Sequence, residues 1–566
     1  MTSTPPDRES DAGQSTNAAV EHLGRLEPQT PPRHQAPSDH RAEGDGALTR
    51  LDAWWGRVLA TPFRQRLWYW GGPAAVTVIA AFLRLWNLGF PHALIFDETY
   101  YVKDSWTLMH LGYEGAWPNN PDPAFNAGHV YGYSSAPEFV AHPPLGKWMI
   151  SLGLRVFGAE NSFGWRVTTA LVGILAVVLL MLIARKLFRS TMIAVIAGFL
   201  MAIDGNAIVM SRVALLDNSV MFVGLLAFGC ILMDRDWHAS RLAAWMAARR
   251  DKPDPPAWGP TLWWRPWLIA AGVLLGACTG VKWNGIYFLA FFAVYTVLVD
   301  AMARRREGLD FWISASILKQ APATFLIMVP IAFVTYVSTW TGWIVTTGGY
   351  FRNWVQTTPG TEWTGALSWV PHWFQNLWHY QVQMYDYSIN LHVYHPYAAN
   401  PLGWLFMVRP TSMYYQSSSA GQPGCTSQFC SSAITEMANP LIWYAATAAV
   451  FYLVYRLIRY REWRVGFILM GLAAGYLPWL LYIGRTVFQF YSIAFEPYML
   501  LALAFTIGMI LGKRTDPPRR RVRGIWIVGV FLALSALLTV FWYPLWTGQV
   551  IPFWYWQLHI WFPSWR

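Results

Sequence analysis

The chain has 566 residues, of which 55% are apolar and only 13% are charged. A soluble protein of this length would form several domains with about a quarter of its residues charged, so the composition excludes that class and indicates an integral membrane protein. The net charge of +11 comes from Arg and Lys that cluster in short loops between apolar segments. This placement follows the positive-inside rule and argues against a nucleic-acid partner.

Residues 1–50 are rich in Pro, Ser and charged residues and show no apolar periodicity, which predicts a disordered tail. The first hydrophobic run begins near Leu67 and is followed by no small-residue cleavage site, so we expect a cytoplasmic N-terminus without a signal peptide. We divide the remainder into an N-terminal transmembrane catalytic module (51–340), which includes a first outer loop (90–162), a large outer loop (341–436) and a C-terminal transmembrane module (437–566).

The apolar segments are long enough to cross a hydrocarbon core of ~30 Å as helices. Eleven spans are expected, at 68–89, 163–187, 191–210, 212–233, 266–282, 285–303, 319–340, 439–459, 464–483, 487–511 and 524–543. The apolar run 143–158 is shorter and carries Lys147 and Arg155, which favours a helix on the outer surface over a short span. The sequence therefore predicts an all-α polytopic protein with its C-terminus outside.

The stretch FPHALIFDETYYVK at 90–103 places Asp97 and Glu98 where the first span should emerge into water. Adjacent residues of a helix or strand point in different directions, so we expect one carboxylate to act as a base and the other to support the loop. One base suffices for transfer from a phosphate leaving group, which needs cationic stabilisation but no general acid. A glycoside hydrolase would need two carboxylates that face each other across a sugar.

Several charged residues lie in or at the ends of predicted spans, where each costs at least ~2.5–3.5 kcal/mol and so needs a partner or a function. Those expected towards the outer half are Arg84, Arg166, Arg212, Asp217, Lys282 and Arg485, and Glu496 also lies in a span. A cationic pocket that faces a carboxylate pair suits a lipid with an anionic head group. The structural alternatives are a pair between Arg212 and Asp217, a bridge from Arg84 to Asp97 or Glu98, and snorkelling of Arg166 and Arg485.

Cys425 and Cys430 lie in a Ser/Gly-rich stretch, and a disulfide between them is expected if that stretch faces an oxidising compartment. A metal site is the weaker interpretation, because two cysteines without nearby histidines supply half a set of ligands. The histidines of the outer loops lack the HxxxH spacing of helical zinc sites. No cofactor is therefore assigned, and a divalent metal is left open without support from the sequence.

The chain resembles the protein O-mannosyltransferases, polytopic enzymes of the lipid-phosphate-sugar-dependent glycosyltransferase C class, and fits actinobacterial members best. The matching stretches are LRLWNLGFPHALIFDETYYVKD (83–104), AHPPLGKWMI (141–150), SRVALLDNSVMF (211–222), GVKWNGIYF (280–288), NPLGWLFMVRP (400–410) and GYLPWLLYIGRTVFQFYSIAFEPYM (475–499). The resemblance implies the glycosyltransferase C fold, with surface helices in the first and largest outer loops. The β-trefoil domain that eukaryotic members insert in the large loop has no counterpart in this sequence.

The resemblance also implies a reaction, in which mannose passes from polyprenyl-phosphate-mannose to Ser or Thr hydroxyls of exported proteins, with inversion, at the outer face of the plasma membrane. Asp97 would be the catalytic base and Glu98 an essential partner. The candidate residues for binding the donor or substrate are Arg84, His142, Lys147, Arg166, Asp217, Lys282 and Arg485. The Sec translocon is a candidate place for meeting the acceptor.

Two other functions compete with this interpretation. A related lipid-phosphate-sugar-dependent transferase could act instead on cell-envelope glycan or lipid, although HPPLGK and LLDNSVMF favour the protein-directed enzymes. A secondary transporter would show repeated halves with broken helices that meet at the membrane midplane. We find no internal repeat in the sequence, and the membrane charges gather on one side.

Overall fold

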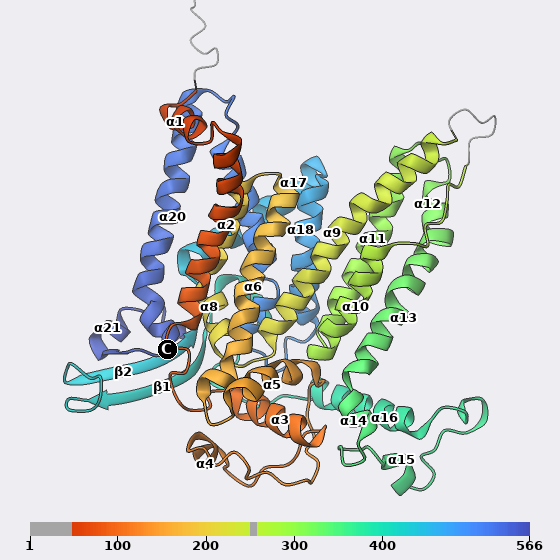
Figure 1. Cartoon of the computed structure of the whole chain (residues 1–566), viewed down its shortest axis with the longest axis vertical. Coiled ribbons are helices and arrows are strands. Elements are labelled where there is room, and N and C mark those ends of the chain that lie inside the picture. The colour runs from red at the N-terminus through yellow and green to blue at the C-terminus, as the bar shows by residue number, and fades with distance from the viewer. Residues whose placement is uncertain (1–47, 250–256) are drawn as a thin grey trace, which may run out of the picture. The chain divides into compact units, whose positions relative to one another are not determined.

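The computed structural model describes residues 48–249 and 257–566 (Figure 1). The predicted disordered tail, except for its last three residues, lies outside the described residues. Helices dominate what is described, which confirms the predicted all-α class. Those up to residue 340 are α1 (Arg50–Val58), α2 (Pro62–Leu85), α3 (Glu98–Leu111), α4 (Asp122–Asn126), α5 (Leu145–Phe157), α6 (Ser162–Phe188), α7 (Thr191–Ile203), α8 (Gly205–Arg212), α9 (Asp217–Ala247), α10 (Pro266–Val281), α11 (Gly285–Arg306), α12 (Trp312–Ala315), the π-helical turn η2 (Ser316–Gln320) and α13 (Ala321–Thr339).

The second part of the chain mixes short surface elements with further long helices. In chain order these are α14 (Thr341–Val345), α15 (Trp354–Thr357), η3 (Gly365–Leu367), α16 (His372–Ile389), η4 (Pro401–Phe406), β1 (Thr411–Ser419), β2 (Phe429–Glu436), α17 (Pro440–Tyr460), α18 (Trp463–Tyr476), η5 (Leu477–Leu481), η6 (Gln489–Ala494), α19 (Glu496–Leu511), α20 (Pro518–Thr547), β3 (Val550–Pro552), α21 (Phe553–Gln557) and η7 (Pro563–Trp565).

Seven helices or helix runs in the described part of the chain are long and apolar enough to cross a membrane. They are α6, α9, α11, the run 312–339, α17, the run 463–481 and α20. The pair α7 and α8 makes an eighth if the two helices are counted as one span. The remaining predicted segments contain α2 and the shorter apolar helices α10 and α19. The chain is thus a multi-pass membrane protein, and the count of eleven spans stays a prediction.

The span predicted at 191–210 is broken at Asp204, where α7 and α8 meet at an angle of 59°. The Asp204 carboxylate accepts hydrogen bonds from the backbone N–H of Asn206 (2.9 Å) and of Asn439 (3.1 Å), and so caps α8 while binding the start of α17. At Gly205 an added Cβ would lie only 2.2 Å from the Trp546 ring and 2.3 Å from the Met437 carbonyl oxygen. The bend therefore lets α8 pack closely against α20 and β2.

The helices of the first outer loop lie across one end of the long helices, in the lower part of Figure 1, which we call the α3–α5 end. Helix α5 has 13 residues and is too short to span a hydrocarbon core. It packs against α3, α6 and α10, as a surface helix should. The opposite end, where α1 lies, is called the α1 end.

A small antiparallel sheet, in the order β1-β2-β3, was not predicted from the sequence. Strands β1 and β2 form a hairpin whose register runs from Thr411 opposite Glu436 to Ser419 opposite Phe429, and a disulfide joins Cys425 to Cys430 in it. Strand β3 pairs with β2, and the Arg409 guanidinium donates to the carbonyl oxygens of Ser564 (2.7 Å) and Arg566 (2.8 Å). The large loop therefore folds against the end of the chain.

Candidate active site

Asp97 lies at the end of a linker that connects α2 to α3, and two buried arginines hold this linker by its carbonyl groups. Arg166 of α6 donates to the carbonyl oxygens of Pro91 and Ala93, both at 3.0 Å. Arg212, at the end of α8, donates to the carbonyl oxygens of Arg84 (2.9 Å), Trp86 (2.7 Å) and Asn87 (3.1 Å). Guanidinium groups with five donors suit this role, because each can satisfy several carbonyls outside regular structure.

Arg84 supports the same region from α2. Its guanidinium is fully buried and donates to Ser211 Oγ (3.1 Å) and to the carbonyl oxygens of Ala202 and Met201 (both 3.0 Å). Arg84 thus fixes α8 and the bend before it. No hydrogen bond or ion pair joins Arg84 to Asp97 or Glu98 in the described residues, so that expected bridge is wrong.

Glu98 is fully buried, and both oxygens of its carboxylate accept hydrogen bonds. Its two oxygens form a bidentate pair with Arg166, with both N–O distances at 2.8 Å. They also accept from the backbone N–H of Ile95 (3.1 Å) and of Ala214 (2.9 Å). Glu98 therefore ties the linker to α6 and to the segment after α8. This pairing also shows that the snorkelling expected as an alternative for Arg166 is wrong.

Asp97 has a different environment. Its side chain is half-buried, and no hydrogen bond to its carboxylate is formed within the described residues. Burial raises the pKa of Asp97 to about 6, although the charge of Lys282 lowers it and that of Asp217 raises it further. The carboxylate is thus largely ionised at neutral pH, open to a ligand and more basic than an ordinary aspartate, which suits a general base.

The residue before Asp97 adopts a left-handed backbone conformation, with a φ of 49° at Phe96. A bulky residue rarely takes this conformation, which costs roughly 1–2 kcal/mol, and it persists only where neighbours hold it. The Phe96 ring packs edge-on against those of Phe488, Phe490 and His395, with centroids 5.5–5.9 Å apart. The direction of the Asp97 side chain is therefore set partly by the second part of the chain.

Lys282 and Asp217 form a buried ion pair beside Asp97, with N–O distances of 2.9 and 3.0 Å. Asp217 begins α9 and Lys282 directly follows α10, and the Lys282 ammonium lies 4.2 Å from the centre of the Tyr491 ring. The expected pair between Arg212 and Asp217 is thus wrong. Sequence reasoning also missed Tyr491, because a tyrosine in an apolar run has no distinctive pattern.

His142 and Lys147 of the HPPLGK stretch have separate surroundings. The ring of His142 lies 6.0 Å from that of Tyr101, and burial together with the charges of Lys282, Lys147 and Arg485 lowers the pKa of His142 well below its ordinary value. His142 is therefore neutral at physiological pH. Lys147 is buried in α5, where its ammonium pairs with Glu114 and lies 3.8 Å from Asp104. This lysine joins α5 to α3 and to the loop after it.

Arg485 forms no ion pair with a carboxylate within the described residues. Its Nε atom is buried without a hydrogen-bond partner, and its guanidinium lies 5.9 Å from the centre of the Trp479 ring. The charge of Arg485 contributes to the lowered pKa of His142, so the two groups lie near each other. An unpaired guanidinium of this kind can bind a phosphate in a bidentate manner.

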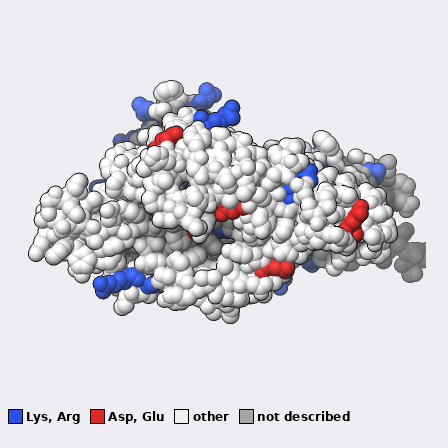
Figure 2. All heavy atoms as spheres, turned by 90° about the horizontal axis from the view of Figure 1, so that it is seen from below, with Lys and Arg blue, Asp and Glu red and all other residues white. Residues whose placement is uncertain are grey.

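An apolar cavity of about 460 Å³ lies between α10, α11, α13 and α16. Its lining includes Trp283, which directly follows Lys282, so the cavity begins next to the charged residues. Figure 2 shows the α3–α5 end, where charged side chains are sparse and acidic ones lie close to a central hollow. The described residues contain no group of three or more His, Cys, Asp or Glu placed to hold a metal ion.

Together these groups form a site with one open carboxylate, one unpaired guanidinium, a neutral histidine and an adjoining apolar cavity. An ionised carboxylate can accept the proton of a hydroxyl, and a guanidinium can stabilise the charge on a departing phosphate. The neighbouring carboxylate, that of Glu98, is fully paired and cannot serve as a second open carboxylate beside Asp97. Its chemistry is therefore that of transfer from a phosphate rather than that of two-carboxylate hydrolysis.

Comparison with known proteins agrees with this chemistry. The family described as dolichyl-phosphate-mannose-protein mannosyltransferase matches residues 74–346, and the C-terminal four TMM region of protein-O-mannosyltransferase matches residues 373–565. The polyprenol-phosphate-mannose–protein mannosyltransferase of Mycolicibacterium smegmatis is 34% identical over 505 residues, which cover 88% of this chain and 93% of that protein. Its counterpart in Mycobacterium tuberculosis is 32% identical over 510 residues, with 89% and 93% covered.

Among solved structures, the S. cerevisiae protein O-mannosyltransferase Pmt1-Pmt2 complex bound to the sugar donor has a similar fold. The TM-score is 0.64 at 14% identity, and the match covers 92% of this chain and 95% of that one. At this identity the likeness concerns the fold, which is the predicted glycosyltransferase C type. The two family matches and the curated relatives establish the family as well as the fold. The chain belongs to the protein O-mannosyltransferase family of membrane glycosyltransferases.

Proposed function

We propose that this protein transfers mannose from polyprenyl-phosphate-mannose to Ser or Thr hydroxyls of exported proteins. The observation that carries the proposal is the contrast between Asp97, whose carboxylate is open and has a pKa raised to about 6, and Glu98, whose carboxylate is fully paired. Only one of the two can act on a substrate. This is what an inverting transfer from a phosphate requires.

In the proposed reaction, Asp97 accepts the proton of the acceptor hydroxyl while the oxygen of that hydroxyl attacks the anomeric carbon of mannose. The bond between that carbon and the phosphate oxygen breaks, and the phosphate leaves with the bonding electrons. Arg485 is the proposed contact for the phosphate, because its guanidinium has no carboxylate partner in the described residues. Lys282 adds positive charge, although Asp217 balances part of it.

The remaining predicted site residues are proposed to position the groups that react. Arg84 and Arg166 hold the linker and the bend behind Asp97, and their donors are occupied by protein oxygens. Lys147 fixes α5 to the first outer loop. His142, neutral and next to Tyr101, is proposed to contact the sugar or the acceptor.

The isoprenoid chain of the donor is proposed to lie in the apolar cavity between α10, α11, α13 and α16. Trp283 links the cavity to Lys282 along the chain, so a lipid there would present its phosphate near the charged residues. We place the α3–α5 end outside the plasma membrane, with the N-terminus in the cytoplasm and the C-terminus outside, because the basic loops gather at the other end. Acceptors would arrive unfolded at this face, as exported chains do at the Sec translocon.

The test is transfer by the purified protein from labelled polyprenyl-phosphate-mannose to a Ser/Thr/Pro-rich peptide. Asp97→Asn should lower transfer by about 100-fold or more while leaving expression unchanged, because it removes a general base. Asp386→Asn, an exposed carboxylate on α16, is the matched control and should keep full activity. Donor consumption without label on the peptide would instead favour a glycan or lipid acceptor.

A second arm of the same assay examines the phosphate contact. Arg485→Ala should raise the KM for the lipid donor more than that for the peptide, whereas Arg155→Ala, an exposed cation of α5, should change neither. An unaltered donor KM in Arg485→Ala would show that another group binds the phosphate. Wild-type turnover by Asp97→Asn would remove Asp97 from the proposed role of base.

A further inference from the structure

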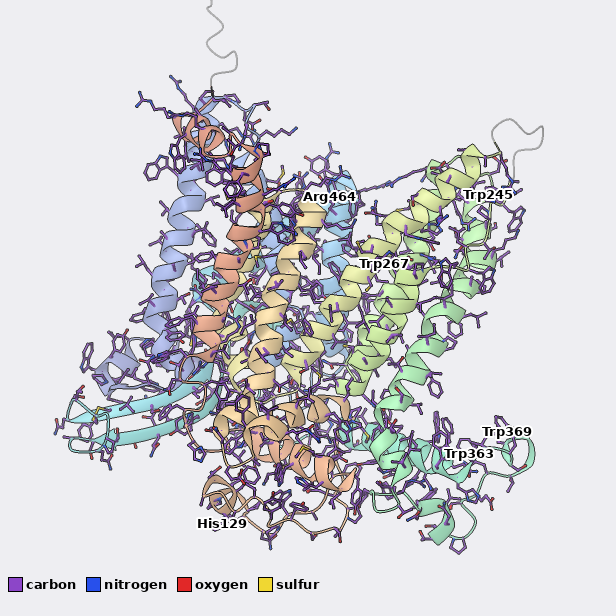
Figure 3. All side chains as sticks on the ribbon, viewed as in Figure 1. His129, Trp245, Trp267, Trp363, Trp369 and Arg464 are labelled. Carbon is purple, nitrogen blue, oxygen red and sulfur yellow. A yellow bond between two sulfur atoms is a disulfide. The ribbon has the colours of Figure 1, made fainter. Side chains whose placement is uncertain are left out.

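A second cavity lies at the α1 end of the bundle, far from Asp97, and nothing in the proposed reaction uses it. Its volume is about 260 Å³, well above the ~30 Å³ that one water occupies in the liquid. Figure 3 shows Arg464, one of its lining residues, at the upper end of α18. The lining comes from the end of α6, the middle of α9 and the start of α18: Lys186, Leu187, Arg189, Leu232, Arg235, Asp236, Trp463 and Arg464.

The lining carries an excess of positive charge. Four cations face a single carboxylate, that of Asp236. Asp236 is already shared, since it accepts from Lys186 Nζ at 2.7 Å and from Arg235 Nη1 at 3.1 Å. Arg189 and Arg464 form no ion pair within the described residues, and Arg464 Nε is buried without a hydrogen-bond partner. A buried, unpartnered donor on a cation is costly unless an anion or water satisfies it.

The start of α18 adds to this charge. Trp463 and Arg464 are its first two residues, and the preceding Glu462 makes no side-chain hydrogen bond to the free amides of the first turn, because its carboxylate pairs with Arg456. The N-terminus of a helix carries partial positive charge and favours anions. The Arg235 guanidinium stacks on the Trp463 ring at 3.5 Å, which holds both side chains at the cavity wall.

We propose that this cavity, called here the α6–α9–α18 cavity, binds a phosphate-bearing anion through Arg189 and Arg464. A phosphate group matches the set of donors, because arginine forks bind its oxygens in a bidentate manner and the site supplies more than one positive charge. In the orientation proposed above, the cavity opens at the cytoplasmic edge of the membrane. The phosphate can therefore come from an anionic lipid head group of the inner leaflet or from a soluble anion.

The experiment uses the full-length protein in nanodiscs that contain either phosphatidylcholine alone or a mixture with phosphatidylglycerol, followed by native mass spectrometry of the retained lipids. Wild type should retain phosphatidylglycerol selectively. Arg464→Gln and Arg189→Gln should each weaken retention by about tenfold or more, since each removes a charge-assisted contact. Arg459→Gln is the matched control, because Arg459 is an exposed cation of α17 outside the cavity.

A second arm separates the two sources of phosphate. Protein in a neutral detergent is titrated with inorganic phosphate, and its unfolding midpoint is compared with that in chloride of equal ionic strength. A rise that Arg464→Gln abolishes, without selective lipid retention, identifies a soluble phosphate as the ligand. The proposal is overturned if wild type and Arg464→Gln retain both lipids equally and phosphate raises neither midpoint. Mannosyl transfer serves as the folding check for the cavity variants.

Discussion

Asp97 and Glu98 are neighbours in the sequence, and their different roles follow from what surrounds each carboxylate. Glu98 receives two donors from Arg166 and two backbone N–H groups, so its charge is completely compensated. Asp97 receives none of these and is left with the unbalanced effects of burial and of nearby charges. A difference in hydrogen bonding, rather than in residue type, thus leaves one carboxylate open to a ligand and the other fully paired.

The raised pKa of Asp97 predicts a pH dependence of transfer. A general base works in its ionised form, so kcat/KM should fall as the pH drops through about 6 and should be constant above it, until another group titrates. Lys282 lowers the pKa of Asp97, so Lys282→Gln should move this acid limb to higher pH. Lys103→Gln removes a cation that pairs with Asp122 instead and should leave the limb in place.

The measurement is the pH profile of kcat/KM with a saturating co-substrate for wild type and both variants. A profile without an acid limb between pH 5 and 7 would exclude Asp97 as the group that titrates. A limb that stays fixed in Lys282→Gln would show that the charge of Lys282 does not reach the base.

At the scale of elements, the linker from α2 to α3 has no regular structure, and charged side chains take the place of a hydrogen-bond ladder. Arg166 and Arg212 donate to its carbonyl groups. The Glu98 carboxylate accepts from one amide of the linker, that of Ile95, and from one amide after α8. Such a linker is rigid because buried polar groups that lose their partners are costly. The position of Asp97 therefore depends on the buried ion pair between Glu98 and Arg166.

Glu98→Gln tests this dependence. It leaves the Arg166 guanidinium buried without its counter-ion, which should destabilise the protein by roughly 3–5 kcal/mol and lower its unfolding temperature. Asp97→Asn, in contrast, should abolish transfer without lowering that temperature, because no partner loses a bond. Adding Arg166→Met to Glu98→Gln should restore part of the stability, since the unpaired charge is removed.

Thermal unfolding in detergent and transfer activity are measured for the four proteins side by side. Equal unfolding temperatures for Glu98→Gln and wild type would contradict the structural role of Glu98. Full activity of the double variant would show that the linker holds Asp97 without the ion pair.

The sequence predicted the long helices well, because apolar length alone identifies a span. It did not reveal the bend at Asp204 or the sheet β1-β2-β3. The capping contact from Asn439 to Asp204 and the packing of Trp546 on Gly205 join residues hundreds of positions apart, and periodicity contains no trace of them. The same holds for the site: residue types indicated which charges matter, but the partners of Arg84, Glu98, Lys147 and Asp217 depended on tertiary contacts.

At the scale of the whole molecule, the two ends of the bundle differ in their content of basic residues. Outer-loop elements, the disulfide and Asp97 belong to the α3–α5 end, whereas the α6–α9–α18 cavity and the basic termini of α6, α11 and α20 belong to the other end (Figure 1). By the positive-inside rule, this distribution of charge supports the proposed orientation, with the α1 end in the cytoplasm.

Cysteine labelling in intact cells measures that orientation. After mild reduction, a membrane-impermeant maleimide should label Cys425 and Cys430 of the hairpin without permeabilisation. Ser240→Cys, placed at an exposed position of α9 in a background with both hairpin cysteines changed to Ser, should be labelled only after the membrane is opened. Labelling of the α9 position in intact cells would reverse the proposed topology.

The close approach at Gly205 has a consequence for chimeric enzymes. Helix α8 belongs to the part of the chain matched at 74–346, whereas Trp546 and Met437, which leave no room for a side chain at Gly205, belong to the part matched at 373–565. In a chimera whose two parts come from different relatives, the surface of α8 and the surface it packs against would have to be complementary at this contact. Exchange of acceptor preference between relatives is therefore better attempted by grafting single outer loops than by joining halves.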